Sequence, residues 1–448
     1  MEKKQQIIRF LIYFIILIPL MLFRDITPNN ELKYLSIADE ALRNGSIFAF
    51  FNHGIQYADK PPLYIWIVML FKVILGKHST FLLSLFSIIP AFITIGVFNR
   101  WCSKQMSKNY IIASELALLT SAYFLGSGLV LRMDMLMTMF ITLAMYTFYR
   151  IYTGNNSIKL KILFPVYIFL AIFTKGPVGF LVPFICIPVF LIINKKIKTI
   201  GKYFGWQTWT ILIILCGLWF WGVYLDGGGE YLNNLLFHQT IDRAVDSFHH
   251  KEPFYYYGIV IWYAIFPWSI LVIGVIAISL FKKQKMSELT KFFICVGTTI
   301  IVMMSFFSAK IVIYILPCFG FLTYGAFLLL ENSPYRKFAE KAPKVIINIA
   351  ASLLLIIGIS GLFIKKFNDR IGFKNVCEEA KIEAQKEKIN RYGYCELRSG
   401  ENMDVFLGQQ LEKISSENLN EVKSIVGDSN GIIIFVKQDK KVIFKVLK

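Results

Sequence analysis

The sequence predicts an all-α polytopic membrane protein that carries a small α/β domain at its C-terminal end. Hydrophobic residues make up 56% of the 448 positions. Several apolar runs reach the roughly 20 residues that an α-helix needs to cross a bilayer. A soluble domain could not bury so much apolar surface. The chain becomes more polar near residue 367, so we expect a transmembrane module at 1–366 and a separate domain at 367–448.

The positions of the apolar runs predict eleven membrane spans. Residues 7–23 form the first, and no small-residue cleavage site follows them, so we do not interpret this run as a removed signal peptide. The apolar segment 61–76 is at the short limit for a span, and we interpret it as an interfacial helix. The other spans are expected at 80–98, 109–127, 131–152, 160–175, 177–194, 207–225, 254–280, 290–307, 311–330 and 345–364.

The net charge of +19 is distributed in a way that predicts topology rather than nucleic-acid binding. Lys and Arg gather in short connections between spans, which is typical of connections that face the cytoplasm and contact anionic lipids. The N-terminus is therefore expected inside. The odd number of spans places the C-terminal domain outside, together with the connections 25–62 and 226–253. The basic connections lie near residues 100–108, 150–161, 195–202, 282–291 and 336–344.

The outward segment 25–62 combines two polar clusters with a short amphipathic helix. Apolar residues recur at helical spacing from Ser36 to Asn44, and Gly45 is a favourable residue to end that helix. Carboxylates and cations held at a membrane surface in this way are typical of an active site at a bilayer interface. The clusters are Asn30-Glu31-Leu32-Lys33-Tyr34 before the helix and Tyr57-Ala58-Asp59-Lys60-Pro61-Pro62 after it.

Further ionisable residues are expected on the same outward side, at the ends of spans or in the connection 226–253. Polar groups at membrane level are costly and usually functional. Cations there suit a phosphate-bearing lipid substrate, and a carboxylate can position or deprotonate the acceptor. A histidine with a carboxylate can hold a divalent metal ion. These residues are Asp134, Lys175, His238, Arg243, Lys310 and Tyr314.

Each of these residues also has an ordinary structural explanation. Asp59 and Lys60 could form a surface pair that caps the interfacial helix, and Asp134 could pair with Arg132 at the end of a span. His238 could be a plain loop histidine, and the two span-end lysines could simply extend to the interface. What favours a functional site is that separate elements bring all of them to one side of the membrane.

The C-terminal domain shows a change in periodicity. Residues 373–389 and 403–422 have helical spacing, and the runs 431–436 and 442–447 read as a β-hairpin about a polar turn. No catalytic constellation is visible there. Cys377 and Cys395 could pair if the domain lies in an oxidising compartment.

The motifs resemble those of the lipid-linked-sugar glycosyltransferases of the GT-C class, in particular the aminoarabinose transferases of lipid A and, more distantly, the protein O-mannosyltransferases. The resemblance covers roughly residues 1–330 and depends on six short motifs in the same order. They are Asn30-Glu31-Leu32-Lys33-Tyr34, Tyr57-Ala58-Asp59-Lys60-Pro61, Asp134, Thr174-Lys175-Gly176-Pro177, His238 with Arg243, and Lys310-Ile311-Val312-Ile313-Tyr314-Ile315-Leu316-Pro317.

The resemblance implies an inverting transferase of the bacterial inner membrane. Such an enzyme moves a sugar from undecaprenyl phosphate to a lipid A phosphate or another envelope acceptor, at the periplasmic face. The implied donor-phosphate residues are Lys60, Arg243, Tyr314 and Lys310, and the implied catalytic residues are Glu31, Asp134 and Asn30. The implied sugar and acceptor pocket comprises Lys33, Tyr34, Tyr57 and Lys175. Asp59 and His238 match ligands of a divalent metal ion such as Zn²⁺, Mg²⁺ or Mn²⁺.

Three positions depart from the family's pattern. Asn30 stands where the family has Asp, Lys33 where it has Arg, and Asp59 where it has Glu. Asn cannot act as a base, whereas a phosphate acceptor is already anionic and needs positioning more than deprotonation. We therefore expect a lipid A phosphate as acceptor, with Glu31 or Asp134 as the alternative base.

Other functions remain open at this stage. A protein O-glycosyltransferase would need a base to activate a hydroxyl, which Asn30 disfavours. A lipid flippase or secondary transporter would place charges near the bilayer midplane. The expected spans are nearly free of charge in their middles, with Glu115 as the exception. A catalytically inactive scaffold is the third alternative.

Overall fold

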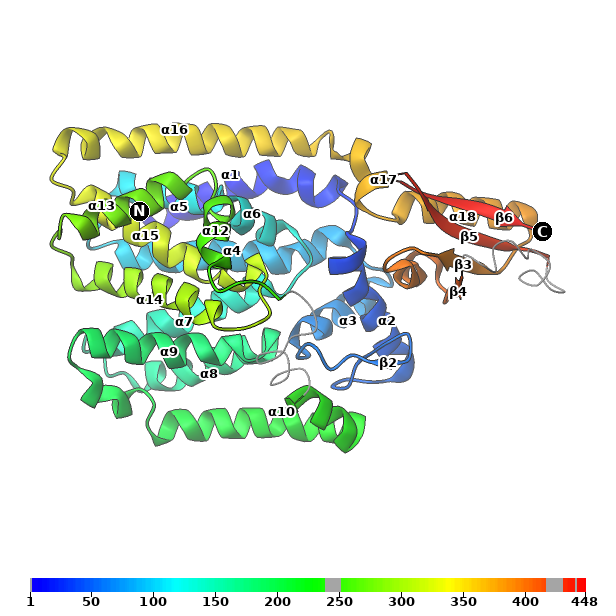
Figure 1. Ribbon diagram of the computed structural model, residues 1–448, viewed down its shortest axis with the longest axis horizontal. Helices are drawn as coiled ribbons and strands as arrows, with labels where there is room; N and C mark the ends of the chain where they lie inside the picture. The colour runs from blue at the N-terminus through cyan, green and yellow to red at the C-terminus, as the bar shows by residue number, and fades with distance from the viewer. Residues whose placement is uncertain (1, 238–250, 416–429, 440) are drawn as a thin grey trace. The chain divides into compact units, whose positions relative to one another are not determined.

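The computed structural model describes residues 2–237, 251–415, 430–439 and 441–448 (Figure 1). It divides into two compact units. Unit 1 comprises Met1–Tyr13, Ala58–Leu63 and Ser84–Ile356, and unit 2 comprises Phe14–Tyr57, Tyr64–Leu83 and Ile357–Lys448. Unit 2 therefore contains the whole of the segment 367–448 together with most of the segment 25–62.

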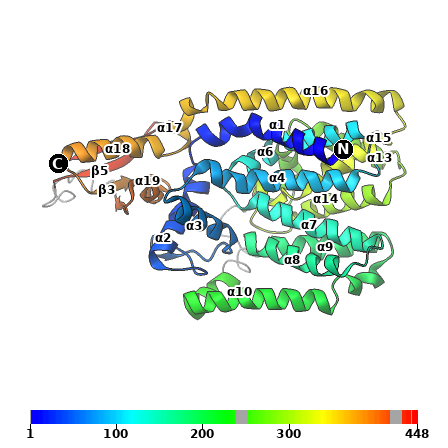
Figure 2. The ribbon, with the colours of Figure 1, turned by 180° about the vertical axis from the view of Figure 1, so that it is seen from behind.

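Unit 1 is built almost entirely of helices. In both views α7, α8 and α9 lie side by side (Figures 1 and 2). After the start of α1 (Glu2–Phe23), its helices are α4 (Thr80–Cys102), α5 (Lys108–Leu119), α6 (Ala122–Leu129), α7 (Asp134–Tyr152), α8 (Ile158–Lys175), α9 (Val178–Ile193), η2 (Ile197–Lys202), α10 (Trp206–Asn233), α12 (Tyr256–Ala264), α13 (Ser269–Phe281), α14 (Glu288–Ser305), η4 (Val312–Ile315), α15 (Cys318–Glu331) and α16 (Arg336–Gly361).

The expected multi-span helical architecture is confirmed. Among the described residues, five helices are long and apolar enough to cross a bilayer, and a sixth span results if the bent pair α5–α6 counts as one. Several other expected spans are shorter apolar helices, among them α9, α13 and α15. The number eleven therefore stays a prediction. The segment 61–76, expected as an interfacial helix, is helical as α3 (Leu63–Leu75).

Two spans that were expected to be continuous are broken. The expected helix 109–127 bends by 67° between α5 and α6. At this break the hydroxyls of Thr120 and Ser121 donate to the carbonyls of Leu116 and Ala117, which competes with regular helix hydrogen bonding. The expected helix 254–280 is divided into α12 and α13, with Pro267 in the connection. Proline has no N–H to continue the helix, which explains the division.

Aromatic rings and glycines bring α4, α14 and α15 together. The ring of Phe98 lies 5.5 Å from that of Phe293 and 5.0 Å from that of Phe321, both edge-on. Such pairs contribute about 0.5–1.5 kcal/mol each beyond the area they bury. A Cβ atom at Gly320 would overlap the ring of Phe98, and one at Gly297 would lie 2.6 Å from a methyl of Leu322. These glycines therefore permit a helix spacing that no larger residue allows.

Glu115, the expected exception to the uncharged spans, lies at the centre of a buried polar network. Its carboxylate accepts from Arg9 Nε at 2.8 Å and Nη2 at 2.9 Å, and from Tyr13 Oη at 2.9 Å. Asn99 donates to it at 2.7 Å and accepts from Tyr324 Oη at 2.6 Å. The network links α1, α4, α5 and α15. It satisfies the charge within the fold, so Glu115 reads as a structural residue rather than a transport site.

The N-terminal part of unit 2 contains the expected amphipathic helix. After η1 (Pro28–Leu32), α2 covers Lys33–Asn44 and ends at Gly45, whose φ of 71° is left-handed. It is followed by the two-residue strands β1 (Phe51–Asn52) and β2 (Ile55–Gln56). Glu40 accepts from the backbone N–H groups of His53 and Gly54, at 2.6 and 2.9 Å, and so fixes the turn between these strands.

The C-terminal part of unit 2 is a small α/β fold with a four-stranded sheet in the order β4-β3-β5-β6. The expected hairpin is confirmed as the antiparallel pair β5 (Ile432–Gln438) and β6 (Lys441–Leu447), and the expected helix at 373–389 as α18 (Lys374–Glu387). β3 (Tyr392–Cys395) pairs in parallel with β5 and with β4 (Glu412–Ile414). The shorter elements are η5 (Ile364–Phe367), α17 (Asn368–Ile371), η6 (Gly400–Met403) and α19 (Asp404–Leu407).

The helix expected at 403–422 is wrong where the structure describes it. Among the described residues of that range, the end of η6 and the single turn α19 are helical, and β4 follows as a strand; residues 416–429 lie outside the described part. Gly408, with φ of 82°, ends α19 after one turn because its left-handed backbone cannot continue the helix. Cys377 and Cys395 are both free and buried, so the structure shows no disulfide between them.

Candidate active site

The candidate site in unit 1 is centred on Asp134, which is fully buried at the first position of α7. One carboxylate oxygen is paired with the ammonium of Lys175, the last residue of α8, and the other accepts from Arg132 Nε at 2.8 Å. Both oxygens are therefore engaged by cations. The pair exists because α7 and α8 are antiparallel neighbours, so the beginning of one lies beside the end of the other.

Helix termini favour this arrangement electrostatically. A carboxylate at the N-terminus of a helix and an ammonium at the C-terminus both oppose the helix dipole. Gly176, at φ 103°, ends α8 directly after Lys175, and Pro177 precedes the first turn of α9. The Lys-Gly-Pro sequence thus fixes the cation at the tip of its helix.

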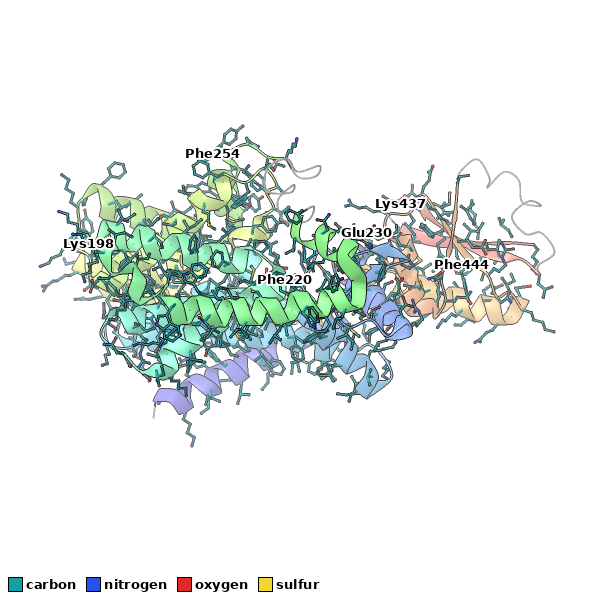
Figure 3. The ribbon with its side chains drawn as sticks, turned by 90° about the horizontal axis from the view of Figure 1, so that it is seen from below. Lys198, Phe220, Glu230, Phe254, Lys437 and Phe444 are labelled. Carbon is teal, nitrogen blue, oxygen red and sulfur yellow. The ribbon has the colours of Figure 1, made fainter. Side chains whose placement is uncertain are left out.

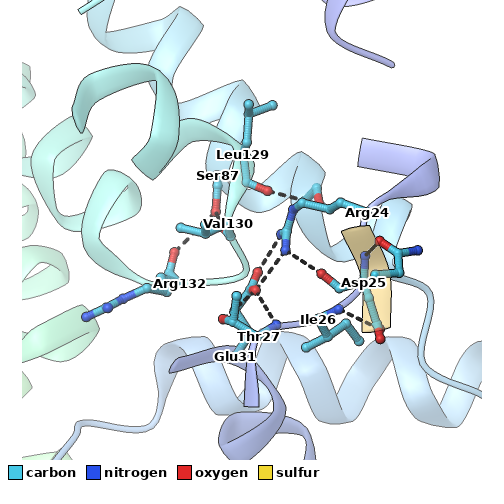
Figure 4. Close-up of polar contacts among 11 residues, drawn as sticks. Arg24, Asp25, Ile26, Thr27, Glu31, Ser87, Leu129, Val130 and Arg132 are labelled. Atoms are coloured by element: carbon cyan, nitrogen blue, oxygen red, sulfur yellow. Dashed lines mark hydrogen bonds and ion pairs between the residues drawn. The ribbon is translucent and has the colours of Figure 1, made fainter. Parts of the chain in front are cut away.

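The loop before α7 is held by hydrogen bonds to α4 (Figure 4). Ser87 Oγ donates to the carbonyl of Val130 at 2.6 Å and to that of Arg132 at 3.2 Å. This places the backbone of Arg132, and so its side chain, next to Asp134. The structural pairing of Arg132 with Asp134 that the sequence left open is present in the structure.

Lys60 and Asp59 extend this charged cluster. The two side chains form an ion pair at 3.1 Å and are largely buried. Lys60 is close enough to Lys175 for the two cations to interact, and Lys175 lies over the ring of Tyr314 at 4.8 Å from its centroid. Three cations and two carboxylates from separate elements thus meet in unit 1. These residues are Lys60, Arg132, Lys175, Asp59 and Asp134; together they are called the cation cluster below.

Lys310 is buried, and its ammonium donates to the carbonyl of Glu252 at 2.7 Å. Tyr257 Oη donates to the carbonyl of Ile311 at 3.2 Å, which ties the next residue to α12. Lys310 therefore fixes the segment that leads into η4 and Tyr314. A direct role of Lys310 toward a donor phosphate stays a prediction.

The first-loop residues belong to unit 2, where Glu31 is fully buried in η1 (Figure 4). It accepts from Arg24 Nη1 at 2.8 Å, and from the N–H and Oγ1 of Thr27 at 2.8 and 2.7 Å. Arg24 was not singled out from the sequence. Its position directly after the first apolar run, seven residues before Glu31, is the signal that could have found it.

The other first-loop residues of unit 2 have mixed environments. Asn30 is exposed, and Lys33 lies over the ring of Tyr57 at 4.3 Å from its centroid. Tyr34 is buried and packs edge-on against Tyr64, with the ring centroids 5.7 Å apart. Their assignment to a sugar or acceptor pocket stays a prediction.

A metal site is not formed by the described residues alone. Within residues 2–237, 251–415, 430–439 and 441–448, no three His, Cys, Asp or Glu side chains are grouped so that they could hold an ion. His238 and Arg243 lie outside the described residues. Asp59 has a cation, Lys60, as its ion-pair partner. We therefore derive no step that requires a metal.

One protein-family model matches the part of the chain that contains the cation cluster. Residues 59–221, which include all five of its members, match the model of the family described as dolichyl-phosphate-mannose-protein mannosyltransferase. The match covers less than half of the chain. Members of the family are glycosyltransferases of the GT-C class, so the resemblance seen in the sequence is confirmed.

Curated proteins that resemble the chain include bacterial sugar transferases. The undecaprenyl phosphate-alpha-4-amino-4-deoxy-L-arabinose arabinosyl transferase of Wigglesworthia glossinidia brevipalpis is 29% identical over 76% of this chain and 61% of its own length. The enzyme of the same description from Proteus mirabilis is 27% identical over 79% of this chain and 64% of its own length. The match thus spans less than two thirds of either relative.

Two solved structures resemble nearly the whole chain in fold. The crystal structure of ArnT from Cupriavidus metallidurans bound to undecaprenyl phosphate has a TM-score of 0.77 at 13% identity, and covers 99% of this chain and 98% of its own. The archaeal oligosaccharyltransferase AglB from Archaeoglobus fulgidus has a TM-score of 0.54 and covers 97% and 70%. At these identities the likeness shows the fold.

Proposed function

We propose that the protein is an inverting glycosyltransferase of the bacterial inner membrane. It moves a sugar, aminoarabinose or another pentose or hexosamine, from undecaprenyl phosphate to a lipid A phosphate or another envelope acceptor at the periplasmic face. The observation that carries this proposal is the cation cluster, in which Lys60, Arg132 and Lys175 meet at helix ends of a membrane-spanning unit. The donors named for the relatives and for the ArnT structure support it.

The cation cluster is suited to a phosphate leaving group. During transfer the bond between the sugar's anomeric carbon and the phosphate oxygen breaks, and the oxygen keeps the electron pair. The polyprenyl phosphodiester, which carries one negative charge, thereby becomes a monoester that carries a second. Three cations against two carboxylates leave one net positive charge to stabilise this change, and a fixed environment does so without reorganisation.

Asp134 acts in this proposal as a positioning residue rather than as a base. Its two oxygens hold Lys175 and Arg132, so neither is directed at an acceptor. Glu31 is likewise engaged, by Arg24 and Thr27. With Asn30 unable to accept a proton, an acceptor that is already anionic fits these residues better than a hydroxyl. This supports a phosphate acceptor, whose oxygen attacks from the face opposite the leaving group.

The test is a transfer reaction with purified full-length protein. Undecaprenyl-phosphate sugars are incubated with lipid A in detergent or liposomes, and the lipid A mass is recorded. We expect a gain equal to one sugar residue and an equal release of undecaprenyl phosphate. The proposed acceptor class would be refuted if none of the donors transferred its sugar to lipid A or to any other envelope lipid tested.

Transfer to protein is the second candidate, because the matching family model is described by a protein mannosyltransferase activity. A serine or threonine hydroxyl must lose its proton during attack, so this reaction would require a base among the residues above. Glycosylation of envelope proteins but not of lipid A, lost on substitution of one carboxylate, would favour this second candidate.

A further inference from the structure

A groove of about 390 Å³ lies between the ends of α13 and α15 and the beginning of α16. Its lining contains two lysines and no carboxylate among the described residues. The residues used below are Val275, Ile278, Lys282, Lys285, Tyr335 and Phe338.

The floor of the groove is fixed by Gln284. Its amide nitrogen donates to the carbonyls of Leu329 and Asn332, both at 2.9 Å, and its amide oxygen accepts from Ser279 Oγ at 2.9 Å. The connection after α13 is thereby tied to the end of α15. The lysines on either side of Gln284 project from a backbone that is already ordered.

The two lysines can donate to an anion. Lys282 donates to Tyr335 Oη and lies over that ring, 4.7 Å from its centroid. An ammonium has three donors, so two are left for a ligand. Lys285 lies on the exposed connection between α13 and α14 and has no ion pair among the described residues. A phosphate between them would receive charge-assisted hydrogen bonds.

The walls of the groove are apolar and open toward the outer surface of the helices. Ile278 is 53% exposed and Phe338 is 56% exposed, on α13 and α16 respectively. Val275 lines the groove one turn further along α13. A free anion makes no use of such walls, whereas an acyl chain does. The combination of lysines at the mouth and apolar side chains along the helices is the chemistry of a phospholipid site.

This groove lies at the opposite end of unit 1 from the cation cluster. Asp134 begins α7, and Tyr152 ends it 18 residues later. Tyr152 Oη contacts both Lys196 and Glu288. Glu288 is the first residue of α14 and follows the connection that carries Lys285. A helix of that length spans roughly 27 Å. Figure 3 shows Lys198, from η2, at this same end and Glu230 at the other end of α10.

We propose that this groove binds the headgroup of an anionic phospholipid, with Lys282 and Lys285 on the phosphate and one acyl chain along Val275, Ile278 and Phe338. The site is separate from the proposed transferase site. It would anchor the end of unit 1 to the leaflet that faces the basic connections.

The experiment is native mass spectrometry of the full chain in a mild detergent, titrated with dioleoylphosphatidylglycerol or dioleoylphosphatidylcholine. We expect tighter binding of phosphatidylglycerol. Lys282→Gln with Lys285→Gln should lower that affinity on the order of tenfold and lower the phosphatidylcholine affinity by a smaller factor, because the choline cation already balances the charge of that lipid's phosphate. Val275→Trp, which fills the groove and keeps both lysines, should weaken phosphatidylglycerol binding as well. The single variant Lys285→Gln serves if the double variant does not fold.

The matched control is Lys198→Gln with Lys202→Gln, which removes two exposed lysines from the same end of the unit but outside the groove. It should keep the parental affinity. Equal loss in control and groove variants would overturn the proposal, because it would indicate diffuse charge attraction. Unchanged affinity in the groove variants would also overturn it, as would displacement of the lipid by millimolar inorganic phosphate.

Discussion

Arg24 and Glu31 form a two-point ion pair inside unit 2: the guanidinium donates from both terminal nitrogens to the two oxygens of a fully buried carboxylate. The carboxylate also accepts a hydrogen bond from the backbone N–H of Thr27. A buried charge with this many partners is costly to leave unpaired. It therefore fixes the turn at the start of the first loop.

We expect Glu31→Gln and Arg24→Met each to destabilise the protein by about 3–5 kcal/mol, because each leaves one buried charge unpaired. The double variant Arg24→Met with Glu31→Leu should recover part of the loss. Thermal unfolding in detergent checks this, with activity measured alongside. If Glu31→Gln melts like the parent protein but transfers no sugar, Glu31 is a catalytic base instead.

Asp134 and Lys175 should behave as a coupled unit. Asp134→Asn leaves two adjacent cations unneutralised, and Lys175→Met leaves the carboxylate with Arg132 alone. In a double-mutant cycle on unfolding free energy, we expect a coupling of about 1–3 kcal/mol. Additive effects within error would show that the ion pair contributes nothing to the fold of the site. The cycle is measured by denaturation of the purified variants.

Lys60 should contribute to binding of the donor phosphate. Lys60→Met removes one of three cations, so affinity for undecaprenyl phosphate should fall about tenfold and become less dependent on salt. Lys159→Met is the control, since Lys159 is exposed in the first turn of α8, the helix that ends at Lys175. A parental affinity for Lys60→Met would remove Lys60 from the phosphate site.

The hydrophobic pattern predicted most helices but not their breaks. Apolar runs located α4, α7, α8, α9 and α16 because burial or lipid contact requires an apolar residue at nearly every position. The break between α5 and α6 depends on two hydroxyls that bond to their own helix, and many unbroken helices carry the same residues. Pro267 was visible in the sequence, but a proline alone does not predict a break, because α9 contains Pro183 and Pro188.

Residue types predicted which of these side chains gather, whereas their roles in a site stay predictions. Asp134, Lys175, Lys60 and Asp59 do gather in unit 1, because each lies at a helix end or in the segment just before a helix. The sequence did not show that Asp134 is engaged on both oxygens, since that depends on how the side chains are directed. Arg24 was missed because it is 7 residues from Glu31, a spacing that is unremarkable without the turn between them.

Asp404 should make stability depend on pH. Burial raises the pKa of this carboxyl in the folded state, although His53, Ser36 and Arg43 oppose the rise. Its contribution to stability is thus fully present below the unfolded pKa of 3.8 and is lost as pH rises through the folded pKa. Asp404→Asn should therefore raise the Tm relative to the parent protein at pH 8, with a difference that shrinks toward about pH 4.

Asp369→Asn serves as a control, because its effect on the Tm should have the opposite sign. A hydrogen bond from Asn375, together with Lys441, lowers the pKa of the Asp369 carboxyl, so its contribution is present near neutral pH and is lost on acidification. The Tm of this variant should lie slightly below that of the parent protein at pH 8, with a gap that closes as pH falls. Parallel curves for the two variants would contradict the assignment.

The network around Glu115 should hold α1 against its neighbours. Glu115→Gln leaves Arg9 without its buried partner, so we expect a loss of about 3–5 kcal/mol. Glu288→Gln is the comparison: this carboxylate is 46% exposed and pairs with Lys196, and its loss should change stability by less than about 1 kcal/mol. Thermal unfolding of both variants in the same detergent measures the contrast.

The contact between Gly320 and Phe98 limits where unit 1 can open. There is no room for a methyl group between Gly320 and the ring of Phe98, and little between Gly297 and Leu322. A sideways shift or rotation of α15 would therefore bring these groups into steric overlap. α4, α14 and α15 are therefore closely packed against one another at these contacts. If the proposed donor is a polyprenyl phosphate, we expect its tail to enter from the bilayer between other helices of this unit.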